Sequence, residues 1–322
     1  MSDHALIGRA KNIPISPATP VVSINPIVIP VPGRFVDLHI RVSAPISGRD
    51  LPIILLSHGH GRSNNLSSLN GYAPLANFWA AHGFVVIQPT HLSSKSLSLP
   101  PETPGGPLFW RSRVEDMKCI INQLDHIETS IPQIQGRIDR HRIAVAGHSM
   151  GGHTAGMLLG ARLIDPDDGA VVDLIEPRIK AGVLLAAPGN GIPDLSTFAA
   201  ENYHFFRHPS FAEMTTPALV VMGDSDEATH LTVRGPSWHA DPYNSSPGPK
   251  SLLTLAGAGH GLGGVAGYDA AETTDESPER LAAVQRLTCA YLRSALYPED
   301  PAWSNACAAL EGLKEIGWIE SK

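Results

Sequence analysis

The stretch VAGHSMGGH, residues 145–153, decides the fold, because it joins an apolar run to a helical pattern through a serine flanked by glycines. Its centre is the pattern G-x-S-x-G, formed here by Gly147, His148, Ser149, Met150 and Gly151. A sharp strand-to-helix turn strains the serine backbone, so the residues two positions away must be small. The turn lifts the Ser149 hydroxyl above the sheet, at the positive end of the following helix. The pattern predicts a nucleophilic serine; the alternative is an ordinary turn in which Ser149 caps the helix.

Apolar runs and helical patterns alternate on both sides of this turn. Runs typical of buried strands lie at 51–59, 84–91, 142–149, 180–189, 217–226 and 251–260. Helical patterns lie at 72–83, 113–127, 151–163 and 277–297. Two further strands, 21–31 and 35–45, come first with no helix between them. We therefore predict an α/β fold with a mostly parallel central sheet, helices on both faces and an antiparallel N-terminal edge.

The length of 322 residues fits one large domain or two smaller ones, at roughly 150 residues per domain. We expect a loose N-terminal arm at 1–19 and a catalytic domain at 20–296. A tail at 297–322 should pack on the surface of the domain through Trp303 and Trp318.

Three connections are too long for simple turns and are expected to be insertions that wall the active site, near 92–112, 189–214 and 227–249. The last two carry, among their aromatic residues, Tyr203, Phe205, Phe206, Phe211, Trp238 and Tyr243. These side chains either line the substrate pocket or pack a small satellite core. Trp238 is the one we assign to the pocket, because it lies between the predicted acid and histidine loops.

Charge and hydropathy exclude several classes of protein. The formal net charge is −7 and lysines and arginines form no cluster, so nucleic acid is not an expected partner. No apolar stretch approaches the roughly 20 residues that span a bilayer. The first twenty residues have no apolar signal core, so we expect a cytoplasmic protein, or a secreted one if a leader has been removed.

The cysteines are Cys119, Cys289 and Cys307. An odd number without a leader favours reduced thiols. A bridge between Cys289 and Cys307, which would join the final predicted helix to the tail, remains open.

A serine hydroxyl needs a base, and the base needs an orienting acid, which follow the serine in the order acid then histidine. His260 directly follows a predicted strand and has glycines on both sides. The alternative is that it is a buried core histidine. His230 and His239 are weaker candidates for the base, because neither directly follows a strand.

Two carboxylates follow the strand at 217–226, and either could be the acid. Asp226 is preferred because it lies further into the loop and can reach over the edge of the sheet. Asp224 is expected to accept hydrogen bonds from backbone amides in its own turn.

Residues 20–296 resemble the α/β-hydrolase superfamily, and most closely the branch of dienelactone hydrolases, chlorophyllases, platelet-activating-factor acetylhydrolases and bacterial cutinase-like polyester hydrolases. The motifs that carry the resemblance are SHGHG at 57–61, AAHGFVVIQP at 80–89, GHSMGG at 147–152, GDSD at 223–226 and GAGHG at 257–261. The resemblance implies the α/β-hydrolase fold and a triad of Ser149, Asp226 and His260. GHSMGG matches the cutinase-like form, whereas SHGHG is nearer the acetylhydrolase and chlorophyllase form. Dienelactone hydrolases have cysteine where this chain has Ser149.

The two histidines of SHGHG raise the possibility of a metal site. A metallo-hydrolase pattern H-x-H-x-D-H would need aspartate and histidine where this chain has Arg62 and Ser63, so no metal is expected. In this fold the loop supplies one backbone N–H to the oxyanion and the residue after the nucleophile supplies another. The resemblance implies the amides of His60 and Met150 as these donors, with His58 as a supporting residue.

We therefore expect a serine carboxylic-ester hydrolase that acts through an acyl-enzyme on small or medium esters, without metal or organic cofactor. The alternative is a cutinase-like polyester or lipid-ester hydrolase. A more distant alternative is a non-catalytic ligand-binding protein on the same scaffold. The expected partner is a small or polymeric ester, and the sequence leaves the oligomeric state open.

Overall fold

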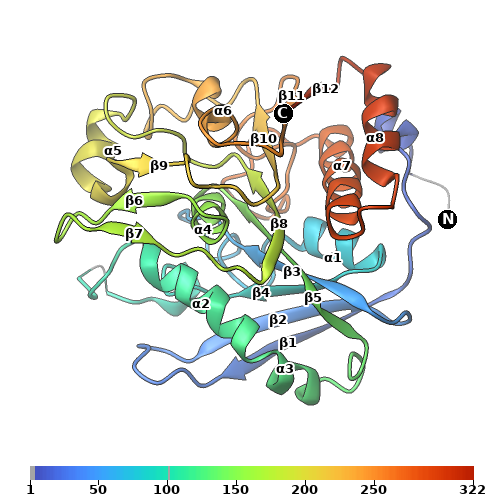
Figure 1. Ribbon diagram of the computed structural model, residues 1–322, viewed down its shortest axis with the longest axis horizontal. Helices are drawn as coiled ribbons and strands as arrows, with labels where there is room; N and C mark the ends of the chain where they lie inside the picture. Colours follow the sequence, from blue (N-terminus) through green and yellow to red (C-terminus); the bar gives the residue numbers. More distant parts are fainter. Residues whose placement is uncertain (1–3, 101) are drawn as a thin grey trace.

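A nine-stranded sheet forms the centre of the computed structural model, which describes residues 4–100 and 102–322 (Figure 1). The strand order is β1-β2-β4-β3-β5-β8-β10-β11-β12. The strands are β1 Val21–Ile29, β2 Leu38–Pro45, β3 Leu51–Ser57, β4 Val85–Pro89, β5 Ile138–His148, β8 Ile179–Leu185, β10 Ala218–Gly223, β11 Lys250–Leu255 and β12 Gly317–Ser321.

The interior of this sheet is parallel, from β4 through β11. At the N-terminal edge, β1 and β2 pair antiparallel and β2 pairs antiparallel with β4, because no helix separates β1 from β2 along the chain. The predicted fold class is confirmed, including this edge. The opposite edge is antiparallel too, since β12 pairs with β11, and the sequence analysis did not predict that strand.

Helices cover both faces of the sheet (Figure 1). The longer ones are α1 Ala73–Ala81, α2 Trp110–Asn122, α3 Leu124–Ser130, α4 Met150–Leu158, α7 Pro278–Leu296 and α8 Ala302–Glu311. The apolar side chains of α2, α3 and α4 belong to one core cluster, and those of α1, α7 and α8 belong to a second. Strand β3 shows why two cores form: Ile53 and Leu55 join the first cluster, while Ile54 and Leu56 join the second.

The predicted helix at 113–127 is divided into α2 and α3 at Gln123, and the predicted helix at 151–163 ends at Leu158. The chain that follows enters a small second sheet of β7 Val171–Asp173, β6 Arg162–Ile164 and β9 Pro209–Ser210. Short helices occupy the long connections: α5 Thr197–Asn202, α6 Asp241–Asn244, and the 3-10 helices η2 Lys95–Leu97, η3 His204–Phe206 and η4 Pro236–Ala240.

The described part of the N-terminal arm is ordered against the domain, so the expectation of a loose segment is wrong there. Residues Ala5–Asn12 form the 3-10 segment η1, which contacts α7. The side chains of Ala10 and Ile13 are fully buried, and the backbone N–H of Arg9 donates to Glu279 Oε1 at 2.6 Å.

The C-terminal tail packs on the domain through α8 and extends the sheet through β12. Trp303 of α8 lies edge-on to Tyr291 of α7, with 5.3 Å between ring centroids. Trp318 of β12 is 44% exposed, so it does not anchor the tail as expected. Because β12 belongs to the central sheet, a boundary at 296 would divide a single structural unit.

No helix among the described residues is long and apolar enough to cross a membrane.

All three cysteines are unbonded in the structure. Burial raises the pKa of Cys289 to about 12 and that of Cys307 to about 11, which keeps both as unreactive thiols at neutral pH. Titration of the denatured protein without reductant should therefore count three free thiols. A count of one would establish the alternative bridge between Cys289 and Cys307.

Candidate active site

Ser149 lies at the turn between β5 and α4 in a strained conformation, with φ 55° and ψ −120°. Its neighbours explain how the turn persists. A Cβ on Gly147 would overlap the carbonyl oxygen of Gly151, and a Cβ on Gly151 would overlap that of Ser57. A Cβ on Gly152 would lie 2.6 Å from the Ala187 side chain, so α4 packs directly on β8 and its exit. The glycines thus permit a turn that leaves Ser149 partly exposed at the carboxyl end of the sheet.

The structure brings Asp226 and His260 together from the loops after β10 and β11. Oδ2 of the buried Asp226 lies 2.7 Å from Nδ1 of His260, whose side chain is 34% exposed. A carboxylate only accepts, so His260 donates from Nδ1. In a neutral ring Nε2 is then the free acceptor, as a general base requires. Among the described residues no hydrogen bond joins the Ser149 hydroxyl to His260, a separation common before substrate binds.

Asp224 has a different environment from Asp226. It is exposed, and its Oδ1 accepts from the Gly257 N–H at 2.7 Å and from the Ser225 hydroxyl at 3.0 Å. These contacts fasten the loop after β11 to the loop after β10. Of the two carboxylates that the sequence offered, Asp226 is the one in contact with His260.

A buried hydrogen-bonded chain joins the serine turn to the two neighbouring loops. The Gly59 N–H donates to Tyr72 Oη at 3.0 Å, and Tyr72 Oη lies 2.8 Å from His148 Nδ1. His148 Nε2 lies 2.7 Å from the carbonyl oxygen of His260, which can only accept. His148 therefore donates from Nε2 and accepts at Nδ1. Burial, followed by the charge of His260, lowers the pKa of His148 to about 3, which keeps it neutral in this role. The part played by Tyr72 has no recognisable signal in the sequence.

The loop 57–61 leaves β3 and runs beside the serine turn. The amide of Gly59 is engaged by Tyr72, whereas the amides of His60 and Met150 have no partner among the described residues. Met150 is the first residue of α4, so its N–H is one of the free donors at a helix start. The resemblance implies these two amides as the oxyanion donors, and that role stays a prediction.

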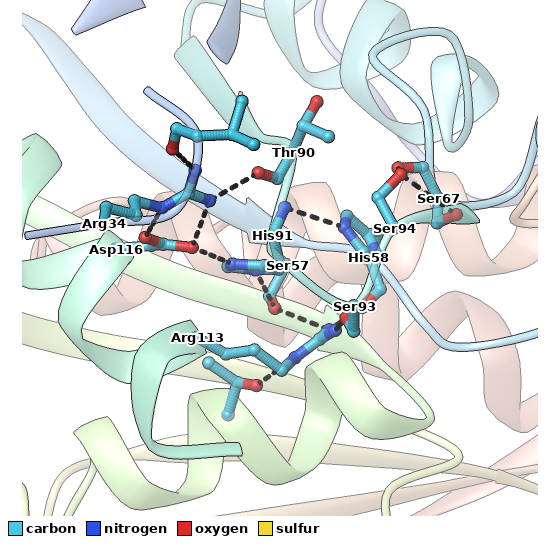
Figure 2. Close-up of polar contacts among 12 residues, drawn as sticks. Arg34, Ser57, His58, Ser67, Thr90, His91, Ser93, Ser94, Arg113 and Asp116 are labelled. Atoms are coloured by element: carbon cyan, nitrogen blue, oxygen red, sulfur yellow. Dashed lines mark hydrogen bonds and ion pairs between the residues drawn. The ribbon is translucent and has the colours of Figure 1, made fainter. Parts of the chain in front are cut away.

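A buried polar network supports this loop from below, and Figure 2 shows its members. Arg113 of α2 is fully buried and donates to the His58 carbonyl oxygen. It also donates to Ser93 Oγ at 2.5 Å and from Nε to Thr154 Oγ1 at 3.0 Å. Burial lowers the pKa of Arg113 to about 9, so it remains charged at neutral pH. One cation therefore ties the loop 57–61 to α4 and to the segment after β4.

The network continues through His91 to a second ion pair. Nδ1 of His91 donates to Asp116 Oδ2 at 2.9 Å, and the Ser57 hydroxyl lies 2.9 Å from Nε2. Asp116 is paired with Arg34 at 2.9 Å (Figure 2). Burial raises the pKa of Asp116 to about 6, although Arg34 acts against this shift. Because Arg113 and Arg34 lie on patterns typical of exposed segments, the sequence did not reveal that they would be buried.

His58 acts as a support within the loop. Its Nδ1 lies 2.6 Å from the Gly59 carbonyl oxygen, and its Nε2 accepts from the His91 N–H at 3.1 Å. Burial lowers the pKa of His58 well below its usual range. Both ring nitrogens of His58 are therefore engaged by backbone groups. Among the described residues, the one cluster of three potential ligands is Asp226, His239 and His260, with ligand atoms within 4.8 Å.

The prediction that Trp238 lines the substrate pocket is wrong. Its side chain is fully buried, and its indole N–H donates to the Asn190 carbonyl oxygen at 2.7 Å. Trp238 lies between the loops of Asp226 and His260 in the sequence, but η4 turns its ring into the core. Three of the four phenylalanines of the 189–214 connection, Phe205, Phe206 and Phe211, are also core residues, whereas Phe198 is exposed.

The connection at 92–112 does adjoin the site. Together with His60 it surrounds a pocket of about 90 Å³ whose lining includes Leu92, Ser93, Lys95 and Phe109. His60, whose amide is free, is one of the residues that line this pocket. It is small and partly polar.

Comparison with known proteins is consistent with this architecture. No family model matches the chain. Cutinase 1 of Thermobifida cellulosilytica is 29% identical over 184 residues, which are 56% of this chain and 51% of that protein. Cutinase of Thermobifida fusca (strain YX) is also 29% identical over 184 residues, and Cutinase est2 of Thermobifida alba is 27% identical. The chain spans about half the length of these relatives, with 44% and 45% of the latter two covered.

The similarity to cutinases agrees with the fold. The parallel interior of the sheet, the helices on both faces and the serine turn after β5 are features of the α/β-hydrolase fold. The chain therefore has the α/β-hydrolase fold, and over about half of its length it is similar in sequence to cutinases.

Proposed function

We propose that this chain is a serine carboxylic-ester hydrolase of the cutinase type. The observation that carries the proposal is the contact of 2.7 Å between Asp226 Oδ2 and His260 Nδ1, beside a serine held at φ 55°. An orienting acid, a base and a strained serine turn at the same edge of a sheet are the parts that nucleophilic acyl transfer needs. Ser149, Asp226 and His260 are the proposed catalytic residues.

The proposed reaction has two halves. His260 Nε2 takes the Ser149 proton as Oγ attacks the ester carbonyl carbon, and the amides of His60 and Met150 donate to the oxyanion. Collapse of this intermediate breaks the ester C–O bond, and His260 gives its proton to the departing alcohol. Water then attacks the acyl-enzyme with His260 again as base, which releases the acid and restores Ser149. Asp226 holds the ring and stabilises the imidazolium.

Two substrate classes have support. The similarity to three cutinases favours polyesters or lipid esters. The pocket of about 90 Å³ beside His60 instead favours small or medium esters, because it would hold only a short chain. We give precedence to the cutinase-type substrate, since the similarity covers 184 residues whereas the pocket reflects one loop.

The test is a series of p-nitrophenyl esters from acetate to palmitate, followed by a film or emulsion of an aliphatic polyester. We expect turnover of short and medium esters and release of soluble acid from the polymer. Turnover limited to short esters, with no release of acid from the polymer, would support an esterase of small esters and contradict the cutinase-type assignment. Absence of turnover on every ester would support the non-catalytic alternative.

The oxyanion loop should tolerate a change of side chain but not a change of backbone. A Cβ on Gly59 would lie 2.7 Å from Tyr72 Oη, so Gly59→Val must displace the loop or the tyrosine. We expect this variant to lose about 10²–10³-fold in kcat, the range for a lost oxyanion donor. His60→Ala keeps the donating amide and should lose about tenfold at most, because the proposed role belongs to the backbone. Equal losses in the two variants would assign the role to the imidazole instead.

Chelation should have no effect on the rate. Asp226 Oδ2 already accepts from His260, and His239 is fully buried, so the cluster of three potential ligands is engaged internally. We therefore expect the same kcat/KM before and after incubation with EDTA. Loss of activity in EDTA that zinc restores would show that a metal takes part.

A further inference from the structure

His239 is a second histidine in contact with the proposed catalytic acid. It lies in η4, on the connection between β10 and β11, and its side chain is fully buried. Its Nε2 lies 3.1 Å from Asp226 Oδ2, the same oxygen that accepts the hydrogen bond from His260 Nδ1. Its Nδ1 lies 2.8 Å from the carbonyl oxygen of Ala187, at the end of β8. In the sequence, His239 is a weaker candidate for the base than His260, because it does not directly follow a strand.

The two neighbours of the ring fix where its protons lie. A backbone carbonyl can only accept, so Nδ1 of His239 carries a hydrogen. A neutral ring would then point the lone pair of Nε2 at an ionised carboxylate 3.1 Å away, between two buried side chains. That arrangement is repulsive at low local dielectric. A hydrogen on Nε2 as well removes the repulsion and turns the 3.1 Å contact into an ion pair, although its geometry is not that of a hydrogen bond.

We propose that His239 is a buried imidazolium that shares Asp226 Oδ2 with His260 and offsets part of the carboxylate charge. This makes His239 a positioning residue, since it acts through Asp226 and does not touch the reacting atoms. With the charge partly offset, Asp226 still orients His260 but binds its protonated form less strongly. His260 then stays neutral, and able to act as a base, to lower pH. This consequence rests on the proposed function.

The surroundings of Asp226 agree with this assignment. Burial alone would raise the pKa of Asp226, but its contacts with His239 and then with His260 hold this pKa well below its usual range. The carboxylate is therefore ionised wherever the enzyme is folded near neutral pH. An ionised carboxylate that is 2% exposed needs a compensating charge, and His239 is the fully buried group beside it.

Among the described residues, His148 and His230 are also close enough to interact electrostatically with Asp226 and His239. The ring centroid of His260 lies 5.6 Å from that of His239. His148, at the end of β5, is neutral because burial lowers its pKa to about 3, and burial also lowers the pKa of the more exposed His230. Asp241, which follows η4, is paired with Arg234 at 2.9 Å, and Arg234 is also paired with Asp194.

The test combines a pH profile with a direct measurement of the ring. In His239→Gln the carboxylate is no longer offset, so the acid limb of kcat/KM should move up by about one pH unit. The matched control is His230→Gln, which removes an exposed histidine from the same connection and should leave that limb in place. An unmoved or lowered limb in His239→Gln would overturn the proposal.

Nitrogen NMR of the unaltered protein, labelled with ¹⁵N-histidine, provides the measurement that needs neither a variant nor activity. The His239 signals can be assigned through the Trp238 ring, whose centroid lies 5.2 Å away. We expect both ring nitrogens to show protonated shifts at pH 7 to 8. One protonated and one unprotonated nitrogen would show a neutral ring and refute the proposal, even if the enzyme hydrolyses esters. Two protonated nitrogens in a protein without esterase activity would refute the proposed function alone.

Discussion

Ser149→Ala should reduce kcat on p-nitrophenyl butyrate by about 10⁴-fold or more, because the variant has no nucleophile and retains only the contribution of binding and oxyanion donors. The fold should be unaffected. Alanine has no bulk beyond Cβ, so it meets the same backbone strain at φ 55° as serine does. The measurement is single-turnover and steady-state kinetics, together with a thermal melting curve that matches the parent protein.

Labelling supplies the positive counterpart of this variant. A fluorophosphonate should add one phosphonyl group to the parent protein, at Ser149, and none to Ser149→Ala. The matched control is Ser225→Ala, since Ser225 is an exposed serine close to the proposed acid in sequence. That variant should react and turn over normally. A label on another residue, or normal turnover by Ser149→Ala, would disprove the assignment of the nucleophile.

The parts of this protein that could be predicted from the sequence are those fixed by neighbours along the chain. The serine turn depends on steric contacts among residues 147–152, and the structure shows each glycine against a backbone or a methyl group. The strands of the parallel interior are continuous apolar runs because both faces are covered. Asp226 and His260 lie in the loops that follow β10 and β11, so their positions at the carboxyl end of the sheet followed from the strand assignments.

The parts that could not be predicted depend on groups far apart in the sequence. Arg113 lies on an amphipathic helix, where a cation is ordinarily exposed, and its burial needs acceptors from Ser93, His58 and Thr154. His239 follows no strand, and only the packing of η4 against the end of β8 places it on Asp226. The final strand β12 is short and mostly exposed, so its pairing with β11 left no clear hydrophobic pattern.

The same distinction explains the error at Trp238. A large aromatic residue between two catalytic loops is compatible with a pocket wall and with a core, and the sequence does not specify which way the loop turns. In the structure the indole N–H of Trp238 donates to the Asn190 carbonyl oxygen, and no part of the ring is exposed. Burial satisfies both the apolar and the polar part of the side chain.

Asp226→Asn should have the second-largest effect, a loss of about 10³–10⁴-fold in kcat, because a neutral amide cannot stabilise the imidazolium of His260. If the amide nitrogen takes the place of Oδ2, it also forces His260 into the wrong tautomer. Asp224→Asn is the matched control. The amide oxygen of the variant can still accept from the Gly257 N–H, and the side chain is exposed, so its activity should stay within about twofold.

The two variants should also differ in their dependence on pH. The folded-state pKa of Asp226 is depressed, so its ionisation stabilises the fold above the unfolded pKa of about 3.9, and this contribution is lost only as pH falls toward the folded value. Asp226→Asn should therefore lower the melting temperature at pH 7 and lose less stability than the parent as the pH is reduced toward 3. Asp224→Asn should follow the parent at every pH. If Asp224→Asn proves the more damaging for kcat, then Asp224 rather than Asp226 is the acid that serves His260.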